Sequence, residues 1–206
     1  MPPRHARAIA HLQAADPVLG AWIQKAGPCS LGRERGGTHF AALARSIVYQ
    51  QLSGKAAGTI HGRFEGLFGD APPTPRQVLA TKHAQLRSVG LSERKAEYIR
   101  DLAAQVERGT LPIETLDDLG DAEVITALTT VRGIGEWTAQ MFLMFRLGRP
   151  DVLPVLDLGV QNAVKKLYRL RTHPKPERVA KIGARWAPYR TVAAWYLWRA
   201  VDDPAQ

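Results

Sequence analysis

The sequence predicts an all-α protein with two helical lobes and a central cleft. Apolar residues recur every three or four positions through most of the 206-residue chain, and alternating strand patterns are nearly absent. Hydrophobic residues make up 45% of the chain, which is enough for a core. Clusters of Pro and Gly at residues 27–37 and 69–75 interrupt the helical pattern and predict loops.

Helical periods are clearest in the middle and at the end of the chain. Residues 40–52 place Phe40, Leu43, Ile47 and Leu52 near one face, which predicts an amphipathic helix. The next periodic segment stops at Gly109, a residue typical of helix ends. The further helices are predicted at residues 93–109, 122–130, 135–148, 158–170 and 189–201.

The predicted lobes divide the chain unevenly. Residues 38–147 form the central lobe, and residues 1–37 combine with residues 148–206 into the second lobe. The first 37 residues are expected to supply only a helix to it. The apolar segment 151–157 contains Pro154 and connects two strong helices, so we expect it to be a buried crossing segment.

Charge points to a polyanionic partner. The formal net charge is +9 and the pI is about 10, and a folded chain this basic commonly binds nucleic acid. The alternative is an ordinary protein with many surface arginines.

Several other classes of site are excluded or disfavoured. A single cysteine, Cys29, rules out an intrachain disulfide, a cysteine-rich zinc site and a four-cysteine iron–sulfur cluster. The six histidines form no close metal-ligand cluster. No apolar run nears the roughly 20 residues of a membrane helix, and the N-terminus lacks a signal-peptide core. We therefore expect a cytoplasmic protein without membrane contact, nucleoid-associated when bound to DNA.

The stretch VRGIGEWTAQMF, residues 131–142, sets a glycine turn at the start of a helix. Gly133 and Gly135 suit a turn that needs positive φ or a close backbone approach. The first N–H groups of the helix that follows are unpaired, and its dipole favours an anion such as a DNA phosphate. The helix at 122–130 would complete a helix–hairpin–helix unit. The alternative is an ordinary turn between helices.

Four motifs together resemble one protein family. They are IVYQQLS (47–53), SVGLSERKA (88–96), VRGIGEWTA (131–139) and DVLPVLDLGVQ (151–161). In these motifs the chain resembles the helix–hairpin–helix, Gly/Pro-rich, aspartate (HhH-GPD) superfamily of DNA glycosylases, most nearly the 3-methyladenine DNA glycosylase II type. The resemblance covers about residues 38–199.

The resemblance places the family's catalytic aspartate at Asp157. Cleavage of an N-glycosidic bond develops oxocarbenium character on the sugar, which a carboxylate stabilises while it orients or deprotonates water. An alkylated purine already carries positive charge, so one carboxylate can suffice. The alternative is that Asp157 only caps a helix, worth about 1 kcal/mol.

Three residues are expected in the base pocket on the same resemblance. Trp137 stands where bifunctional relatives carry a Schiff-base lysine, so we expect base removal without strand cutting. Its ring would also face a cationic base, a contact worth about 0.5–2 kcal/mol. Trp198 matches a second pocket aromatic, and Met141 replaces an aromatic of closer relatives. The alternative interpretation makes the tryptophans core residues.

The remaining site residues are expected to contact DNA or a cation. The predicted phosphate contacts are Gly133, Ile134, Gly135 and Thr138. Gln50 and Gln51 match the wedge that fills the gap left by the extruded base, or they form a solvated helix end. Main-chain carbonyls of Thr129, Val131 and Ile134 would bind Na⁺ or K⁺ at the hairpin.

These observations predict a monomeric, monofunctional DNA glycosylase of base excision repair. Its partner would be double-stranded DNA containing alkylated bases such as 3-methyladenine, and it would require no cofactor. The alternatives are a non-catalytic helix–hairpin–helix DNA-binding module, a bifunctional oxidised-base glycosylase, and a basic helical scaffold for other proteins.

Overall fold

The chain folds into helices joined by short loops. The computed structural model describes residues 5–32 and 36–202, and these residues contain no β-strand. The all-α prediction is therefore confirmed for the described part of the chain. Residues 33–35 of the predicted 27–37 loop lie outside the described residues. No helix among the described residues is both long enough and apolar enough to cross a membrane.

The chain divides into two compact units. One, here called the central unit, comprises Glu34–Arg146, and the other, the terminal unit, comprises Met1–Arg33 and Leu147–Gln206. Both ends of the chain thus contribute to the terminal unit, while one continuous segment forms the central unit.

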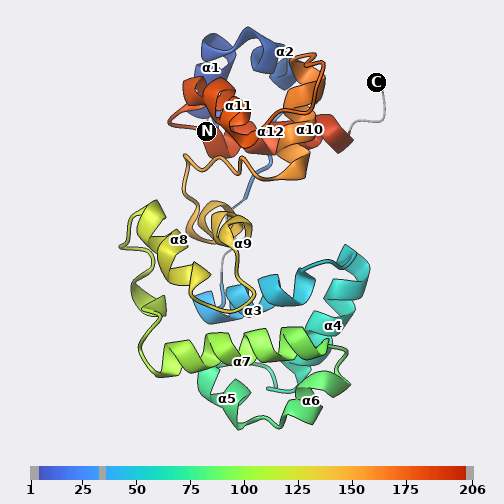
Figure 1. The fold of residues 1–206 in the computed structure, drawn as a ribbon, viewed down its shortest axis with the longest axis vertical. Coiled ribbons are helices and arrows are strands. Elements are labelled where there is room, and N and C mark those ends of the chain that lie inside the picture. The colour runs from blue at the N-terminus through green and yellow to red at the C-terminus, as the bar shows by residue number, and fades with distance from the viewer. Residues whose placement is uncertain (1–4, 33–35, 203–206) are drawn as a thin grey trace. The chain divides into compact units, whose positions relative to one another are not determined.

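The terminal unit is a bundle in which α10 packs against α12 and α12 packs against α2 (Figure 1). Its apolar core includes Leu12, Leu19, Val164 and Leu197, which are all fully buried. Its elements are α1 (Ala6–Ala15), α2 (Pro17–Ala26), α10 (Leu158–Leu167), α11 (Pro176–Gly183), the 3₁₀ turn η3 (Ala184–Trp186) and α12 (Arg190–Asp202).

The N-terminal segment forms two helices, so the prediction of one helix there was wrong. Pro17 cannot continue α1 but suits the first position of α2, and Asp16 caps that helix through the N–H groups of Val18 and Leu19. Asp16 is fully buried, and its other oxygen accepts hydrogen bonds from Tyr168 (2.6 Å) and Trp186 (2.9 Å). Burial and then the bond to Asp16 raise the pKa of Tyr168.

The central unit is organised around α7, which packs against α3 and α5 (Figure 1). Phe40, Leu43, Ile99 and Leu102 form part of its core. Its elements are α3 (His39–Tyr49), α4 (Gly54–Gly66), α5 (Pro75–Ala80), α6 (His83–Ser88), α7 (Glu93–Glu107), the 3₁₀ turn η1 (Ile113–Thr115), α8 (Asp121–Thr129), α9 (Glu136–Met141) and the π-helical η2 (Phe142–Leu147).

Two predicted helices have different ends in the structure. The helix predicted over 40–52 ends at Tyr49, because Gln50 has an extended ψ of 130° and Gln51 then adopts a left-handed φ of 56°. Leu52 is consequently 39% exposed instead of lying on the buried face. The helix predicted over 135–148 is α-helical only as far as Met141 and continues as η2.

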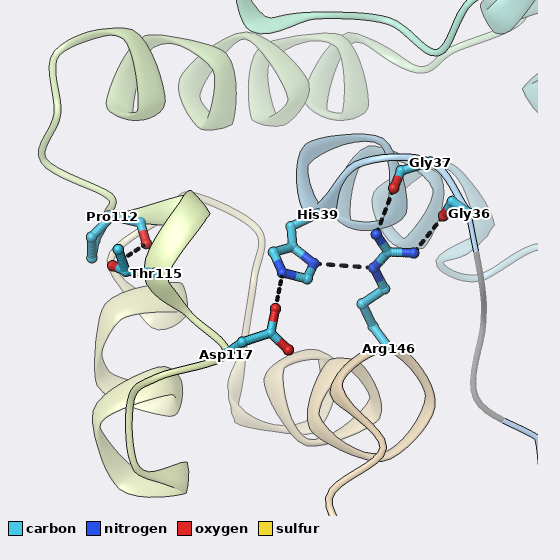
Figure 2. Close-up of polar contacts among 7 residues, drawn as sticks. All are labelled: Gly36, Gly37, His39, Pro112, Thr115, Asp117 and Arg146. Atoms are coloured by element: carbon cyan, nitrogen blue, oxygen red, sulfur yellow. Dashed lines mark hydrogen bonds and ion pairs between the residues drawn. The ribbon is translucent and has the colours of Figure 1, made fainter.

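One polar network joins the two ends of the central unit (Figure 2). Arg146 donates to the carbonyls of Gly36 (2.5 Å) and Gly37 (2.7 Å) and, through Nε, to His39 Nδ1 (3.0 Å). Because arginine can only donate, His39 Nδ1 accepts, and Nε2 donates to Asp117 (2.7 Å). The network anchors the beginning of the unit, beside α3, to its last residue.

Candidate functional site

The hairpin, defined here as residues 130–135 between α8 and α9, requires glycine at one position. Gly133 has a φ of 83°, and a Cβ built there would lie 2.1 Å from Cδ2 of Tyr98. Gly135 has a φ of −93° and nothing within 4 Å of such a Cβ. The turn itself is closed by Ile134 N–H, which donates to the Val131 carbonyl at 3.1 Å. Positive φ is therefore needed at Gly133 alone.

Two polar side chains of α7 form hydrogen bonds with the hairpin backbone. The sequence pattern did not predict these contacts. Asp101 Oδ2 accepts from the backbone N–H of Arg132 at 2.9 Å. Gln105 donates to the Thr130 carbonyl (3.1 Å) and accepts from the Thr130 hydroxyl (3.0 Å). Gln105 also donates to Asp101 at 3.0 Å, so the two side chains act together on the turn.

The two glutamines after α3 have different environments. Gln50 Nε2 donates to the Gly133 carbonyl at 2.9 Å and lies 3.5 Å from the Thr138 hydroxyl oxygen. Lys95, whose pKa is lowered by burial, donates to the main-chain carbonyls of Val48 (2.7 Å) and Gln50 (2.6 Å). Gln51 is exposed and left-handed. Gln50 is thus hydrogen-bonded to the hairpin. Gln51 is exposed in a loop whose preceding backbone is held by Lys95.

The predicted DNA contacts of the hairpin differ in exposure. Gly133 and Gly135 are exposed, whereas Ile134 is buried and Thr138 is only 5% exposed. The hydroxyl of Thr138 therefore faces the protein, and contact with a phosphate at these positions would come through the main chain.

Trp137 lies in the first turn of α9 and is 46% exposed. This exposure is inconsistent with the interpretation of Trp137 as a core residue, because buried aromatic side chains of this unit such as Phe64 are fully enclosed. Met141, one turn later, is half-buried. Glu136 accepts a hydrogen bond from Gln140 at 2.9 Å and adds a negative charge to the first turn of the helix.

Asp157 is held at the N-terminus of α10 by two donors. Its Oδ1 accepts from the N–H of Val160 at 2.8 Å, which makes it the N-cap of the helix, and from the indole N–H of Trp198 at 2.9 Å. The side chain is half-buried, so it is not sealed inside the core. The capping role is therefore real, and it fixes the orientation of the carboxylate.

Gly159 allows this close approach of Trp198. A Cβ built at Gly159 would lie 2.9 Å from Trp198 Cδ1 and 3.0 Å from Asp157 Oδ1. The requirement for glycine in the sequence DLG thus comes from the indole packed over the first turn of α10. Nothing in the sequence pattern distinguished this glycine.

Asp157 is the only acidic residue between positions 152 and 164 of the sequence, and the lysines of α10 lie in its last turn. Leu156 is 51% exposed and Leu158 is 69% exposed. Lys165 lies eight residues along the helix, or about 12 Å at the α-helical rise. Lys166 donates to the Ala200 carbonyl at 2.9 Å.

Trp198 and Trp195 lie on the same helix but make different contacts. Trp198 reaches Asp157, whereas Trp195 packs edge-on against Tyr196 with ring centroids 4.9 Å apart. Arg199 lies over the Trp195 ring at 5.6 Å. The choice of Trp198 over Trp195 as a site residue is thus consistent with its contact to the carboxylate.

Trp198→Phe is expected to slow base release about tenfold, because it removes a hydrogen bond to a charged group, typically worth about 1.5–3 kcal/mol, while it keeps an aromatic face. The measurement is single-turnover base release from methylated DNA, with duplex affinity measured in parallel. Trp195→Phe is the matched control and should leave the rate unchanged. Equal rates for the two variants would mean that the indole N–H does not position Asp157.

The structure brings the site residues together in two groups. Gln50, Gly133, Thr138 and Trp137 belong to the central unit, and Asp157 and Trp198 belong to the terminal unit. No group of three or more His, Cys, Asp or Glu side chains in the described residues is placed to hold a metal ion. The carbonyl oxygens at Thr129, Val131 and Ile134 are the hard donors a monovalent cation prefers, and that cation stays a prediction.

Comparison with known proteins identifies the family. Residues 44–188, which include both the hairpin and Asp157, match the model of the HhH-GPD superfamily base excision DNA repair protein. The chain belongs to the HhH-GPD superfamily. The resemblance inferred from the four motifs is thereby confirmed.

Two relatives with similar sequences carry names of DNA glycosylases or glycosidases. The chain is 31% identical over 196 residues to the alkylbase DNA glycosidase-like protein mag2 of Schizosaccharomyces pombe, covering 94% of this chain and 92% of mag2. It is 34% identical over 169 residues to the putative DNA-3-methyladenine glycosylase YfjP of Bacillus subtilis. That match covers 79% of this chain but 59% of YfjP, so the chain spans little more than half of that HhH-GPD relative.

Solved HhH-GPD structures have the same fold. The 3-methyladenine DNA glycosylase Mag1 of S. pombe, in complex with abasic DNA, superposes with a TM-score of 0.84 at 32% identity, covering 97% of this chain and 98% of Mag1. The DNA-3-methyladenine glycosidase of Bacillus halodurans gives 0.83 at 42% identity, covering 94% and 88%. An 8-oxoguanine glycosylase/lyase of Clostridium acetobutylicum shares the fold at 17% identity.

Proposed function

We propose that this protein is a monofunctional DNA N-glycosylase of base excision repair that removes alkylated purines such as 3-methyladenine. The observation that carries the proposal is Asp157, a half-buried carboxylate fixed by the N–H of Val160 and the indole of Trp198 in a chain of the HhH-GPD superfamily. The relatives named 3-methyladenine glycosylases support the substrate class. The Mag1 complex with abasic DNA supports DNA as the partner.

Asp157 would act on the sugar from which the base departs. As the glycosidic bond lengthens, positive charge develops on the deoxyribose, and a fixed carboxylate stabilises that charge without reorganising. The same carboxylate would orient water for attack at C1′. A methylated purine leaves as a neutral base because it is already cationic, so a sequence with no acid other than Asp157 between positions 152 and 164 fits this substrate.

The hairpin would bind the DNA backbone. Exposed main-chain N–H groups at the start of α9 suit a phosphate, and such contacts position the duplex without reading its sequence. A monovalent cation on the carbonyls of Thr129, Val131 and Ile134 would add positive charge beside that phosphate. Trp137 and Trp198 would contact the extruded base, with Met141 beside Trp137.

Release of bases from methylated DNA tests the proposal directly. The protein should liberate methylated purines and leave abasic sites that break only after alkali treatment. Borohydride should trap no covalent complex with DNA, because tryptophan replaces the lysine of strand-cutting relatives. Binding without release would favour the non-catalytic module, and borohydride trapping would favour a bifunctional enzyme.

Gln51 is the residue we expect to enter the base stack. Gln51→Gly removes its side chain and suits the left-handed backbone, so stability should not fall. Base release should fall about tenfold. Extruding a base from the duplex costs a few kcal/mol, and the variant has no side chain to fill the gap that the base leaves.

Gln50→Ala should instead lower the free energy of unfolding by about 1 kcal/mol, because it loses the hydrogen bond to the Gly133 carbonyl. Thermal unfolding and single-turnover release distinguish the two; an unchanged rate for Gln51→Gly excludes it as the wedge.

A further inference from the structure

The positive net charge of the chain is located entirely in the terminal unit. The central unit, which carries the hairpin, holds 13 Lys or Arg and 13 Asp or Glu, so its formal net charge is zero. Chain totals of 28 and 19 leave 15 basic and 6 acidic residues in the terminal unit, which therefore carries the whole +9. The hairpin is thus not the source of the basic character that suggests a polyanion.

Most of this excess lies in one stretch, residues 165–185, here called the basic segment. It runs from the last turn of α10 through α11 to η3. Glu177 is its one acidic residue. Its eight basic residues are Lys165, Lys166, Arg169, Arg171, Lys175, Arg178, Lys181 and Arg185.

The folded helix gathers part of this charge on one face. Arg178 and Lys181 lie three residues apart on α11, and Arg185 follows four residues later on η3; all three are exposed, while Val179 and Ile182 are buried. These three residues span about 10 Å along α11 and η3. Double-stranded DNA presents one phosphate per about 1.7 Å of axis, so a surface of this length reaches several phosphates.

The charges of the basic segment are not neutralised by the protein. Within the described part of the chain, six exposed basic residues make no ion pair: Lys165, Arg169, Arg171, Lys175, Arg178 and Lys181. Arg185 approaches only the buried Asp16, at 3.9 Å. In the central unit, by contrast, Arg87 pairs with Glu93 at 3.1 Å. Unpaired like charges repel one another, and a bound polyanion removes that repulsion.

Arg169 places a basic side chain where the backbone conformation is unfavourable for any residue other than glycine. It has a φ of 51° at the position after Tyr168, the C-cap residue of α10, where glycine usually ends a helix. A left-handed non-glycine residue costs roughly 1–2 kcal/mol. Helix-dipole stabilisation accounts for Lys165 and Lys166 in the last turn of α10 and for Lys181 in the last turn of α11, but not for Arg169, Arg171, Lys175 or Arg178.

We propose that the basic segment is a second DNA-backbone surface, separate in the chain from the hairpin, which supplies most of the electrostatic affinity for duplex DNA. The inference rests on the proposed function for its choice of polyanion. The surface suits phosphates better than a protein partner, because none of the exposed large apolar side chains in the described residues lies between 165 and 185. Protein interfaces normally have an apolar centre.

Salt-dependent binding tests the proposal. The triple variant Lys175→Gln, Arg178→Gln, Lys181→Gln removes three charges from the basic segment. The matched control, Arg63→Gln, Arg76→Gln, Lys82→Gln, removes three exposed and unpaired charges from the central unit. Affinity for an undamaged duplex is measured at several NaCl concentrations. Each lost phosphate contact should reduce the slope of log affinity against log salt by about 0.9, and affinity near 0.1 M salt should fall at least tenfold for the first variant only.

Equal slopes for the two triple variants would overturn the proposal. The variant Lys175→Arg, Lys181→Arg keeps the charge and should bind as the unaltered protein does, and thermal unfolding checks that all variants are folded. Base release from methylated DNA is measured separately. If the unaltered protein binds DNA through this segment but releases no base, the proposed enzymatic function is wrong and the proposed DNA-binding surface is supported. If it releases bases while the two triple variants have equal slopes, the enzymatic function is supported and the proposed surface is wrong.

Discussion

Base release from methylated DNA is expected to fall by about 10²- to 10⁴-fold in Asp157→Asn, because the amide cannot stabilise the developing cation or accept a proton from water. The fold should be unaffected. Asparagine caps helices as well as aspartate does, so the bond from the Val160 N–H at 2.8 Å is retained. Its oxygen also remains an acceptor for the Trp198 indole.

The measurement is single-turnover release of methylated purines under saturating protein, together with duplex affinity. Affinity should remain within a few-fold of that of the unaltered protein, because Asp157 is not expected to bind phosphate. Asp118→Asn, which removes an exposed carboxylate outside both the hairpin and the basic segment, is the control and should release bases normally. Undiminished release by Asp157→Asn would remove the central element of the proposed mechanism.

Gly133→Ala is expected to disrupt the hairpin and lower duplex affinity at least tenfold. Alanine at a φ of 83° is strained by roughly 1–2 kcal/mol, and its Cβ would lie 2.1 Å from the Tyr98 ring, so the turn or the ring must move. The Gly133 carbonyl would then lose its alignment with Gln50 Nε2. We expect the free energy of unfolding to fall by about 2 kcal/mol or more.

Gly135→Ala is the matched control for this prediction. Its φ of −93° is ordinary and its Cβ would meet nothing within 4 Å, so stability should be unchanged. The combination of Gly133→Ala with Tyr98→Ala removes the clash but not the backbone strain, so Gly133→Ala should cost less in that background. Chemical denaturation of the four proteins gives the coupling. If both glycine substitutions cost the same in the presence of Tyr98, the packing explanation is wrong.

Local features of the fold were predictable because their partners are close in the sequence. Ser53, Ser92 and Asp157 each accept a hydrogen bond from the N–H three residues later, at 3.4, 3.3 and 2.8 Å. A cap of this kind depends on only four consecutive residues. Helical periodicity and the positive φ at Gly133 are local in the same sense. The end of α3 was missed because Gln50 and Gln51 leave the helical conformation although neither is glycine or proline.

The family and the candidate carboxylate also followed from the sequence, because four short motifs keep their order and spacing. What these motifs could not show is how their side chains are held. Trp198 contacts Asp157 from 41 residues away, Gln50 contacts Gly133 from 83, and Asp101 contacts Arg132 from 31. Each bond depends on how segments distant in the sequence come together, and that is decided by the packing of the whole unit.

Charge illustrates the same division between sequence and tertiary structure. Composition alone determined that the chain is basic, with a net +9. Only the folded chain decides which of these charges are exposed and which are paired, as the exposed basic residues of the basic segment show. The reason is physical: composition sums charges over the chain, whereas a polyanion responds to charges that folding places on one exposed and unpaired surface.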